Sequence, residues 1–330
     1  MSSLVSEVAP LLASRRNSDG LWREFRTLAG EGIDWPSSFI GLQLLRAGCS
    51  RDLLVPTATA LIDRQHDDGG WGYHADVPTD ADTTACVLLF LVAIGCRSAV
   101  ISRAAACLVR HQHPESGGVC TYAKHRPILR YMRLGAHIPL DGWCRAHLEV
   151  TAIAGAAFAS LGKEHAAEAK AAWRYVSERQ RSDGSWPAYW WASRHFSTLQ
   201  AVELAAAMGD MNAVWRAADW VQSGQRRDGS WCRPKSVFAT AASLSILAIA
   251  GGHRTCRQRA SQSLSARREV DGFWPSHAEM RIPPPWVTKP DDYHPWRVHS
   301  LGTGVIANDH NRLFTSALCV AALARSERAL

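Results

Sequence analysis

The sequence predicts an all-α protein with an (α/α)6 toroid, in which an outer ring of six helices surrounds an inner ring of six. Three observations indicate this fold class. A turn of the form Gln-x-x-x-Gly-x-Trp recurs through most of the 330 residues. Each turn lies between an amphipathic stretch and a stretch that is apolar nearly all round. No segment alternates regularly between apolar and polar residues, so we expect almost no sheet.

The recurring turn has six copies, with glycines at positions 20, 69, 117, 184, 229 and 272. Three copies are complete, two lack only the glutamine, and the copy at Gly117 has an extra residue and no tryptophan. We expect each motif tryptophan to wedge between neighbouring hairpins with its N–H bound to a carbonyl. Each glutamine can hydrogen-bond backbone groups at the next helix start. The spacing after Gly117 is the longest, which indicates an insertion of roughly 20 residues in the third unit.

These units predict the helices in order. The outer helices are expected at 2–15, 51–65, 98–112, 164–180, 212–225 and 255–268, and the inner ones at 34–47, 80–95, 145–161, 196–208, 236–250 and 310–325. The last inner helix is as apolar as the middle ones, which favours a closed ring over an open stack with polar end caps. We therefore expect one domain over residues 1–330, with insertions at about 118–142 and 276–309. The second insertion is expected to be a lid or a binding loop.

The composition of the chain limits the partners and the cellular compartment that we expect for it. Lys and Arg number 37 against 30 Asp and Glu, without a dense basic block, so we expect no nucleic-acid partner. The longest apolar run, Ala85–Ile94, is too short to cross a bilayer, and no signal peptide is evident at the N-terminus. Nine cysteines without a Cys-x-x-Cys pair favour a reducing compartment. These features predict a cytoplasmic protein.

The segment Thr79-Asp80-Ala81-Asp82-Thr83-Thr84 follows the second turn, where an apolar inner helix begins. Helix capping explains one acidic residue at such a place. It does not require two carboxyls two residues apart, followed by two threonines, at the rim of an apolar ring. This segment is therefore the candidate for chemistry, with a capping carboxylate as the alternative role of Asp82.

The repeats together with Asp80-Ala-Asp82-Thr83-Thr84-Ala85 resemble the squalene–hopene cyclase and class II terpene cyclase superfamily, which combines this turn with a DxDD-type acid motif. Thr83 stands where many members have a third Asp, so this chain has a DxDTT variant. The resemblance implies that Asp82 protonates an alkene or epoxide, with Asp80 and Thr83 orienting it. Burial would keep Asp82 protonated, and the helix N-terminus would make it a better proton donor.

Further site residues are expected around this acid. Aromatic faces stabilise carbocations without trapping them, and the candidates are Trp35, Trp143, Trp190, Trp191, Trp296, Phe196, Phe238 and Phe314. His147, at the third inner helix start, can hydrogen-bond the acid, reprotonate it or act as the terminating base; an ordinary helix-start histidine is the alternative. The cations of the first insertion form either a diphosphate-binding group or a solvated basic loop, and they are Lys124, Arg126, Arg130 and Arg133.

The expected substrate is a linear prenyl chain of C15 to C20, as a diphosphate or attached to an aromatic head, and the reaction is an isomerising cyclisation. The resemblance implies no cofactor for protonation, although Mg2+ is possible with a diphosphate, and no metal ligands are assigned. Peripheral membrane contact is plausible for so apolar a substrate, and the oligomeric state stays open.

Three alternatives remain. A protein prenyltransferase β subunit needs a zinc site, for which Asp141-Gly-Trp-Cys144 has the wrong spacing. A glycosidase needs two carboxylates across a polar cleft, and the apolar inner helices argue against it. The third alternative is a toroid that binds without catalysis.

Overall fold

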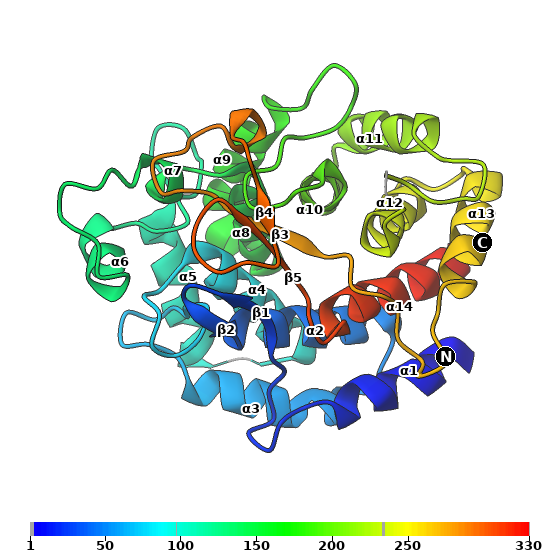
Figure 1. The fold of residues 1–330 in the computed structure, drawn as a ribbon, viewed down its shortest axis with the longest axis horizontal. Helices are drawn as coiled ribbons and strands as arrows, with labels where there is room; N and C mark the ends of the chain where they lie inside the picture. Colours follow the sequence, from blue (N-terminus) through cyan, green and yellow to red (C-terminus); the bar gives the residue numbers. More distant parts are fainter. Residues whose placement is uncertain (1–2, 97, 233–234, 330) are drawn as a thin grey trace.

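The computed structural model describes residues 3–96, 98–232 and 235–329; residue 2 of the first expected helix therefore lies outside the described residues. Six apolar helices form a closed inner ring (Figure 1). They are α2 (Asp34–Ala47), α4 (Ala81–Ile94), α8 (Leu148–Ser160), α10 (Arg194–Ala207), α12 (Val237–Ala250) and α14 (Leu313–Arg328). Each packs against the next in this order, and α14 packs against α2. The predicted all-α toroid is confirmed.

The outer ring is formed by α1 (Ser3–Ser14), α3 (Val55–Asp63), α5 (Ala99–His111), α9 (Ala166–Ser177), α11 (Met211–Ser223) and α13 (Arg254–Ser265). Short 3-10 turns, η1 (Arg51–Leu54) and η2 (Gly162–His165), precede α3 and α9. The helix ends agree with the predicted ones to about three residues, apart from these two turns. Every helix in the described ranges is too short or too polar to span a membrane.

The recurring turn joins the two rings as predicted. The indole N–H of each motif tryptophan donates to a carbonyl ten residues earlier, at 2.7–2.8 Å, for Trp22, Trp71, Trp186, Trp231 and Trp274. The amide of Gln180 donates both to its own turn, at Gly184, and to the carbonyl of Ala213 in α11. Gly184 has a φ of +90°, and a Cβ there would lie 2.2 Å from the carbonyl oxygen of Arg216. Only glycine fits this close approach between hairpins.

Both insertions contain regular structure. The first holds α6 (His125–Tyr131) and α7 (Asp141–Cys144), and the second holds β3 (Glu279–Ile282), η3 (Pro290–Asp292), β4 (Arg297–Val298) and β5 (Val305–Asn308). Strand β5 pairs antiparallel with β3 and parallel with β4. A hairpin of β1 (Glu24–Thr27) and β2 (Gly30–Gly32) contacts β5. These strands are too short for a period of two to be visible in the sequence.

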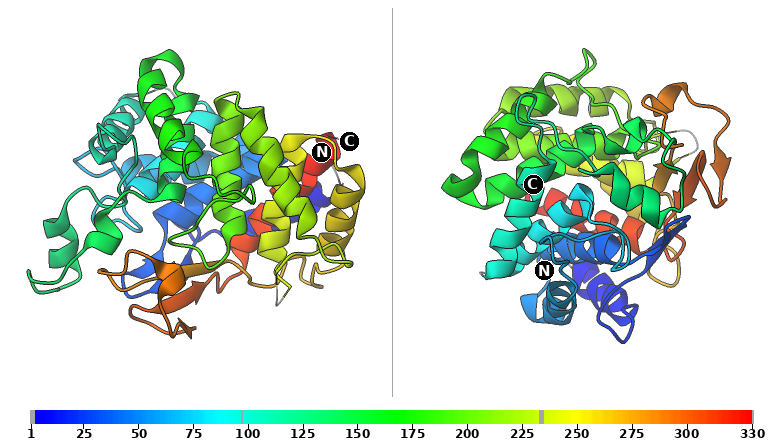
Figure 2. Two further views of the ribbon diagram at one scale, coloured as in Figure 1. Left: turned by 90° about the horizontal axis from the view of Figure 1, so that it is seen from above. Right: turned by 90° about the vertical axis from the view of Figure 1, so that its left-hand side faces the viewer.

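The inserted segments gather at one end of the ring, where α6 and the β3–β5 sheet project from the helices (Figure 2). Residues from α6 and from β3 line one cavity at that end. That residues 1–330 form a single domain stays a prediction.

Candidate active site

A cavity opens at this end of the toroid, over the N-termini of α2 and α4. It contains about 760 Å³ of space, including the part that is open to solvent at its mouth. Its walls are mostly apolar and aromatic, with a few hydroxyl groups and two carboxyls. The lining residues are Thr27, Leu28, Ala29, Trp35, Tyr73, Asp80, Asp82, Thr83, Thr121, Tyr122, Ile128, Met132, Trp143, Trp190, Trp191, Met280 and Ile282. An apolar cavity with few polar groups is typical of a small-molecule site.

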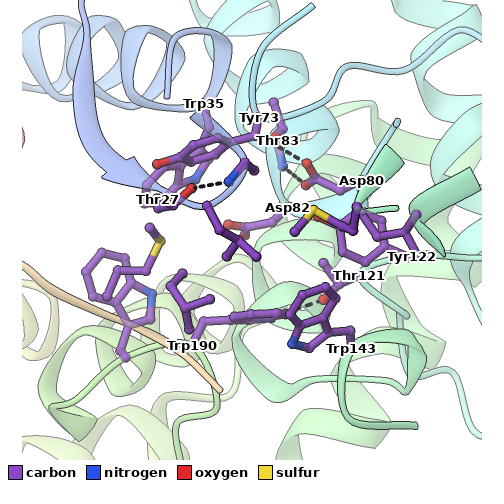
Figure 3. Close-up of a pocket in the computed structure, with 17 residues that line it drawn as sticks. Thr27, Trp35, Tyr73, Asp80, Asp82, Thr83, Thr121, Tyr122, Trp143 and Trp190 are labelled. Carbon is purple, nitrogen blue, oxygen red and sulfur yellow. Dashed lines mark hydrogen bonds between the residues drawn. The ribbon is translucent and has the colours of Figure 1, made fainter. Parts of the chain in front are cut away.

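Asp80 is the N-cap of α4. One carboxylate oxygen accepts the backbone N–H of Thr83 at 2.7 Å, and the other accepts the Thr83 hydroxyl at 2.9 Å (Figure 3). Burial raises the pKa of Asp80 to about 7, against the hydrogen bonds from Thr83, which lower it. Thr83 thus fixes Asp80, whereas the sequence predicted that both orient Asp82.

Asp82 lies in the first turn of α4 and faces the cavity between Trp35 and Trp190 (Figure 3). One carboxylate oxygen, Oδ1, is buried and has no hydrogen-bond partner among the described residues. Burial raises the pKa of Asp82 well above its ordinary value, and the charges of Asp80 and Glu149 add to this rise. A hydrogen bond from Trp35 lowers the pKa by less. These effects favour the protonated form of this carboxyl, which is the form that a general acid needs.

The six inner helices begin in the same way, so that each has one residue at an equivalent position of its first turn. In every unit a backbone N–H of the recurring turn donates to a Ser or Thr hydroxyl in the first turn of the following inner helix, at Ser37, Thr84, Thr151, Thr198, Thr240 and Ser316. The residue two positions before each hydroxyl therefore has an equivalent place in the ring. These inner-ring positions are Trp35, Asp82, Glu149, Phe196, Phe238 and Phe314.

Four of the six inner-ring positions are aromatic and pack together beneath the cavity. The ring centroids of Trp35 and Phe314 are 4.9 Å apart, and those of Phe196 and Phe238 are 5.1 Å apart. Trp191 stacks on Phe238 at 5.4 Å and also lines the cavity. The structure therefore places Phe196, Phe238 and Phe314 behind Trp35 and Trp191 instead of on the cavity surface.

His147 lies behind the cavity wall. Its Nδ1 meets the hydroxyl of Thr121 at 2.7 Å, and its Nε2 meets the carbonyl oxygen of Gly142 at 2.8 Å. Burial lowers its pKa to about 3, so the imidazole is neutral, with Nε2 donating and Nδ1 accepting. Thr121 lines the cavity and also accepts the indole N–H of Trp190 at 3.1 Å. His147 thus meets the cavity wall from behind, at Thr121 and at Trp190, whose ring centroid is 5.5 Å from that of His147.

The remaining predicted residues lie outside the cavity. Trp296 packs against Tyr293 with ring centroids 5.1 Å apart, in the second insertion. The cations of the first insertion, Lys124, Arg126, Arg130 and Arg133, are all exposed, although Ile128 and Met132 from the same segment line the cavity. Of the predicted residues, those that line it are Trp35, Asp80, Asp82, Thr83, Trp143, Trp190 and Trp191.

Sequence reasoning missed several polar groups of this site. Tyr73, Thr121 and Tyr122 line the cavity. Glu149 lies on the neighbouring inner helix, and its charge acts on Asp82. Aligning the six inner helices on the Ser or Thr of their first turn would have found Glu149, because that alignment places it at the position of Asp82.

Comparison with known proteins identifies the family of this chain. The family described as the squalene-hopene cyclase C-terminal domain matches residues 73–281, which is more than half of the chain. The chain belongs to this family, within the class II terpene cyclase superfamily.

Individual relatives are similar over most of the chain. A protein of known structure from Actinoplanes is 30% identical, with a TM-score of 0.90 over 99% of both chains. A variant of the type II terpene cyclase MstE from Scytonema, in complex with geranylgeranyl dihydroxybenzoate as substrate, is 27% identical, with a TM-score of 0.90 over 100% of this chain and 98% of that one. Drimenyl diphosphate synthase from Streptomyces showdoensis is 28% identical over 253 residues, 70% of this chain and 43% of that protein. The chain thus spans less than half the length of the curated relatives it matches.

Proposed function

We propose that the protein is a class II terpenoid cyclase, which starts the cyclisation of a linear prenyl chain by protonating a carbon–carbon double bond. One observation carries this proposal: a buried carboxyl, Asp82, with its pKa raised well above the ordinary value, faces a cavity walled by tryptophans. A protonated carboxyl beside aromatic faces is the combination that a carbocation reaction needs.

The reaction is balanced in protons. The O–H bond of Asp82 breaks as a new C–H bond forms at one end of an alkene, and the other alkene carbon becomes a cation. Further double bonds of the chain attack in turn, each forming a ring C–C bond and moving the charge. Loss of a proton from the last cation gives a cyclic isomer of the substrate. The faces of Trp35, Trp190 and Trp191 stabilise the moving charge.

For the head group we favour a prenylated aromatic of C15 to C20 chain length. The residues described around the cavity include Tyr73, Thr121 and Tyr122 but no Lys, Arg or His. These neutral groups suit a phenol or carboxylic acid better than a diphosphate. A prenyl diphosphate is the second candidate, supported by the drimenyl diphosphate synthase relative and by the exposed cations Arg126 and Arg130 on α6.

Mg2+ does not fit the residues of this cavity. Asp80 and Asp82 are its acidic lining residues, and both oxygens of Asp80 are bound by Thr83. The described residues contain no group of three or more His, Cys, Asp or Glu that could hold a metal. We derive no step through Mg2+.

The decisive experiment offers the protein geranylgeranyl and farnesyl dihydroxybenzoates and the corresponding prenyl diphosphates in parallel. Extracts are analysed by mass spectrometry for products of unchanged mass and shifted retention. The Asp82→Asn variant, with circular dichroism as the check on folding, is expected to form no product. Equal turnover in this variant would refute the proposal.

We also infer a cytoplasmic enzyme that touches membranes peripherally to collect its substrate. Three apolar side chains of the second insertion are about half exposed or more, at the same end as the cavity: Trp286, Val298 and Leu301. Co-sedimentation with lipid vesicles should fall when Trp286 and Leu301 are both changed to Ser, and unchanged co-sedimentation would contradict this inference.

A further inference from the structure

Glu149 is the second carboxyl among the six inner-ring positions, on α8, which packs directly against α4. Its side chain is buried. One oxygen, Oε1, accepts the backbone N–H groups of Tyr189 at 2.7 Å and of Trp190 at 2.6 Å. The other oxygen, Oε2, is buried without a hydrogen-bond partner among the described residues. Glu149 thus anchors the Trp190 wall of the cavity with one oxygen and leaves the other uncommitted.

Asp82 is the other carboxyl of this kind, because its Oδ1 is also buried and has no hydrogen-bond partner in the described part of the chain. Two carboxyls on neighbouring helices in an apolar environment cannot both be charged without a large cost. Two N–H donors stabilise the charged form of Glu149, whereas the Oδ1 atom of Asp82 accepts no hydrogen bond from the described residues. The one proton that this pair retains therefore belongs on Asp82.

We propose that Glu149 is a positioning residue for the proton donor, whose fixed negative charge keeps Asp82 protonated between turnovers. This inference rests on the proposed function. When Asp82 gives its proton to the alkene, α4 and the neighbouring α8 each hold a carboxylate with a buried oxygen. The repulsion between these carboxylates favours the return of a proton to Asp82, either the one released at the end of cyclisation or one from solvent.

Other charged and titratable groups around the pair support this division. Asp80, at the N-cap of α4, adds to the repulsion that raises the pKa of Asp82. Cys86, one turn further along α4, is a neutral thiol because burial raises its pKa to about 12. Burial raises the pKa of Glu149, whereas the N–H groups of Trp190 and Tyr189 and the charge of Arg281 on β3 act in the opposite direction. Tyr189 stays neutral, since burial and Glu149 both raise its pKa. The pKa of both carboxyls is raised, but that of Asp82 is raised more strongly, so Glu149 is the charged member of the pair.

Two substitutions separate the charge of Glu149 from its hydrogen bonds to the N–H groups of Tyr189 and Trp190. Glu149→Gln keeps an oxygen that can accept the N–H groups of Tyr189 and Trp190 but removes the charge. Glu149→Asp keeps the charge but withdraws it from those N–H groups. We expect the pH above which kcat falls to move down by about one unit or more in the Gln variant. The Asp variant should keep the wild-type pH profile at a lower kcat.

A second measurement needs no substrate. Infrared difference spectra over a pH titration report the protonated carboxyl band of Asp82, assigned by its loss in Asp82→Asn. The midpoint of this band should fall in Glu149→Gln by the same amount as the kinetic profile. The matched control is Glu24→Gln, because Glu24 is also buried and accepts backbone N–H groups, from Asn311 and Leu313, at the start of α14. It should leave the Asp82 midpoint unchanged.

The outcomes distinguish the two proposals. An unchanged midpoint in Glu149→Gln overturns the role of Glu149, even if Asp82→Asn abolishes turnover and the proposed function stands. A shifted midpoint supports the role of Glu149, even if wild-type protein cyclises none of the substrates offered and the proposed function fails. An equal shift in Glu24→Gln would also overturn it, because a buried Glu-to-Gln change outside α4 and α8 would then have the same effect.

Discussion

The starts of α4 and α12 have the same pattern of backbone and capping hydrogen bonds, but one presents a carboxyl and the other an aromatic ring. In α4 the cap Asp80 accepts the N–H of Thr83, and in α12 the cap Ser236 accepts the N–H of Ala239. In both, a threonine hydroxyl donates at 2.7 Å to the carbonyl of the cap, from Thr84 and from Thr240. The same hydroxyls accept the backbone N–H groups of Trp71 and Trp231.

The two helix starts differ at the position between these fixed points. It holds Asp82 in α4 and Phe238 in α12, where the phenyl ring packs on Trp191. The hydrogen bonds of the helix start therefore fix the position of this side chain. The residue type at that position decides whether it packs in the core or presents an acid to the cavity. The following changes test how far this separation goes.

The largest expected effect is the loss of cyclisation in Asp82→Asn, by about 10³-fold or more, because an amide cannot act as the acid. Phe238→Leu at the matching position of α12 should lower activity far less. Initial rates with the best substrate, at equal circular dichroism signal, measure both. Similar losses in the two variants would mean that the position, and not the carboxyl, carries the activity.

The next effect is a pH dependence of stability at the third helix start, where His147 takes the place of Asp80. Its pKa in the folded protein is about 3, lowered by burial from 6.5. The unfolded chain therefore binds more protons below pH 6.5, and stability falls as pH decreases from 6.5 toward 3.

Thermal melts between pH 7 and pH 4 measure this effect as the difference between wild type and His147→Gln. The difference removes the opposite contribution of Glu24, whose raised pKa of about 8 favours the folded state at lower pH. Equal pH slopes for both proteins would show that His147 does not contribute.

A smaller effect is expected when one of the repeated tryptophan hydrogen bonds is removed at a site remote from the cavity. Trp231→Phe removes the indole N–H that binds the carbonyl oxygen of Val221. The carbonyl keeps the backbone N–H of Gly224 as a donor, so the lost hydrogen bond and the smaller buried ring together cost about 1–3 kcal/mol of unfolding free energy. Urea unfolding measures the loss, while activity below the transition should stay near wild type. A large loss of activity without loss of stability would contradict the separation of these repeated hydrogen bonds from the chemistry.

The smallest effect is expected for Asp80→Ser, which gives α4 the cap that α12 already has. Stability should change by less than about 1 kcal/mol, because serine caps as well as aspartate. Activity should fall by about tenfold, since loss of the Asp80 charge lowers the pKa of Asp82 and with it the fraction of Asp82 that is protonated. A loss as large as that of Asp82→Asn would make Asp80 a direct participant in proton transfer.

The repeats made the rings predictable, because each unit repeats the same contacts between Trp, Gln, Gly and a helix-start hydroxyl. Asp82 was predictable for the same reason, since the acid motif stands at a fixed distance from a turn. The strands β3 and β5 were not, because each has four residues and its pairing partner lies more than twenty residues away. Such pairing depends on tertiary contacts that local patterns do not contain.

The cavity wall was predictable only in part. Among the aromatic candidates that line the cavity are Trp190 and Trp191. Phe196, Phe238 and Phe314 do not line it, since aromatic residues at inner helix starts are equally suited to core. The exposed cations Arg126 and Arg130 show that charge in an insertion does not indicate which way the side chains face. Glu149 escaped because a lone glutamate in a first helical turn is ordinary.

The glutamines that connect one hairpin to the next have a consequence for how the molecule comes apart. Gln65, Gln112, Gln180 and Gln225 each reach from one turn into the first turn of the following outer helix. An open solenoid can unfold from its terminal repeats. In a closed ring, whose hairpins are linked by these glutamine hydrogen bonds, no repeat is terminal in this sense. Such a protein should resist partial unzipping and lose its structure in one cooperative step.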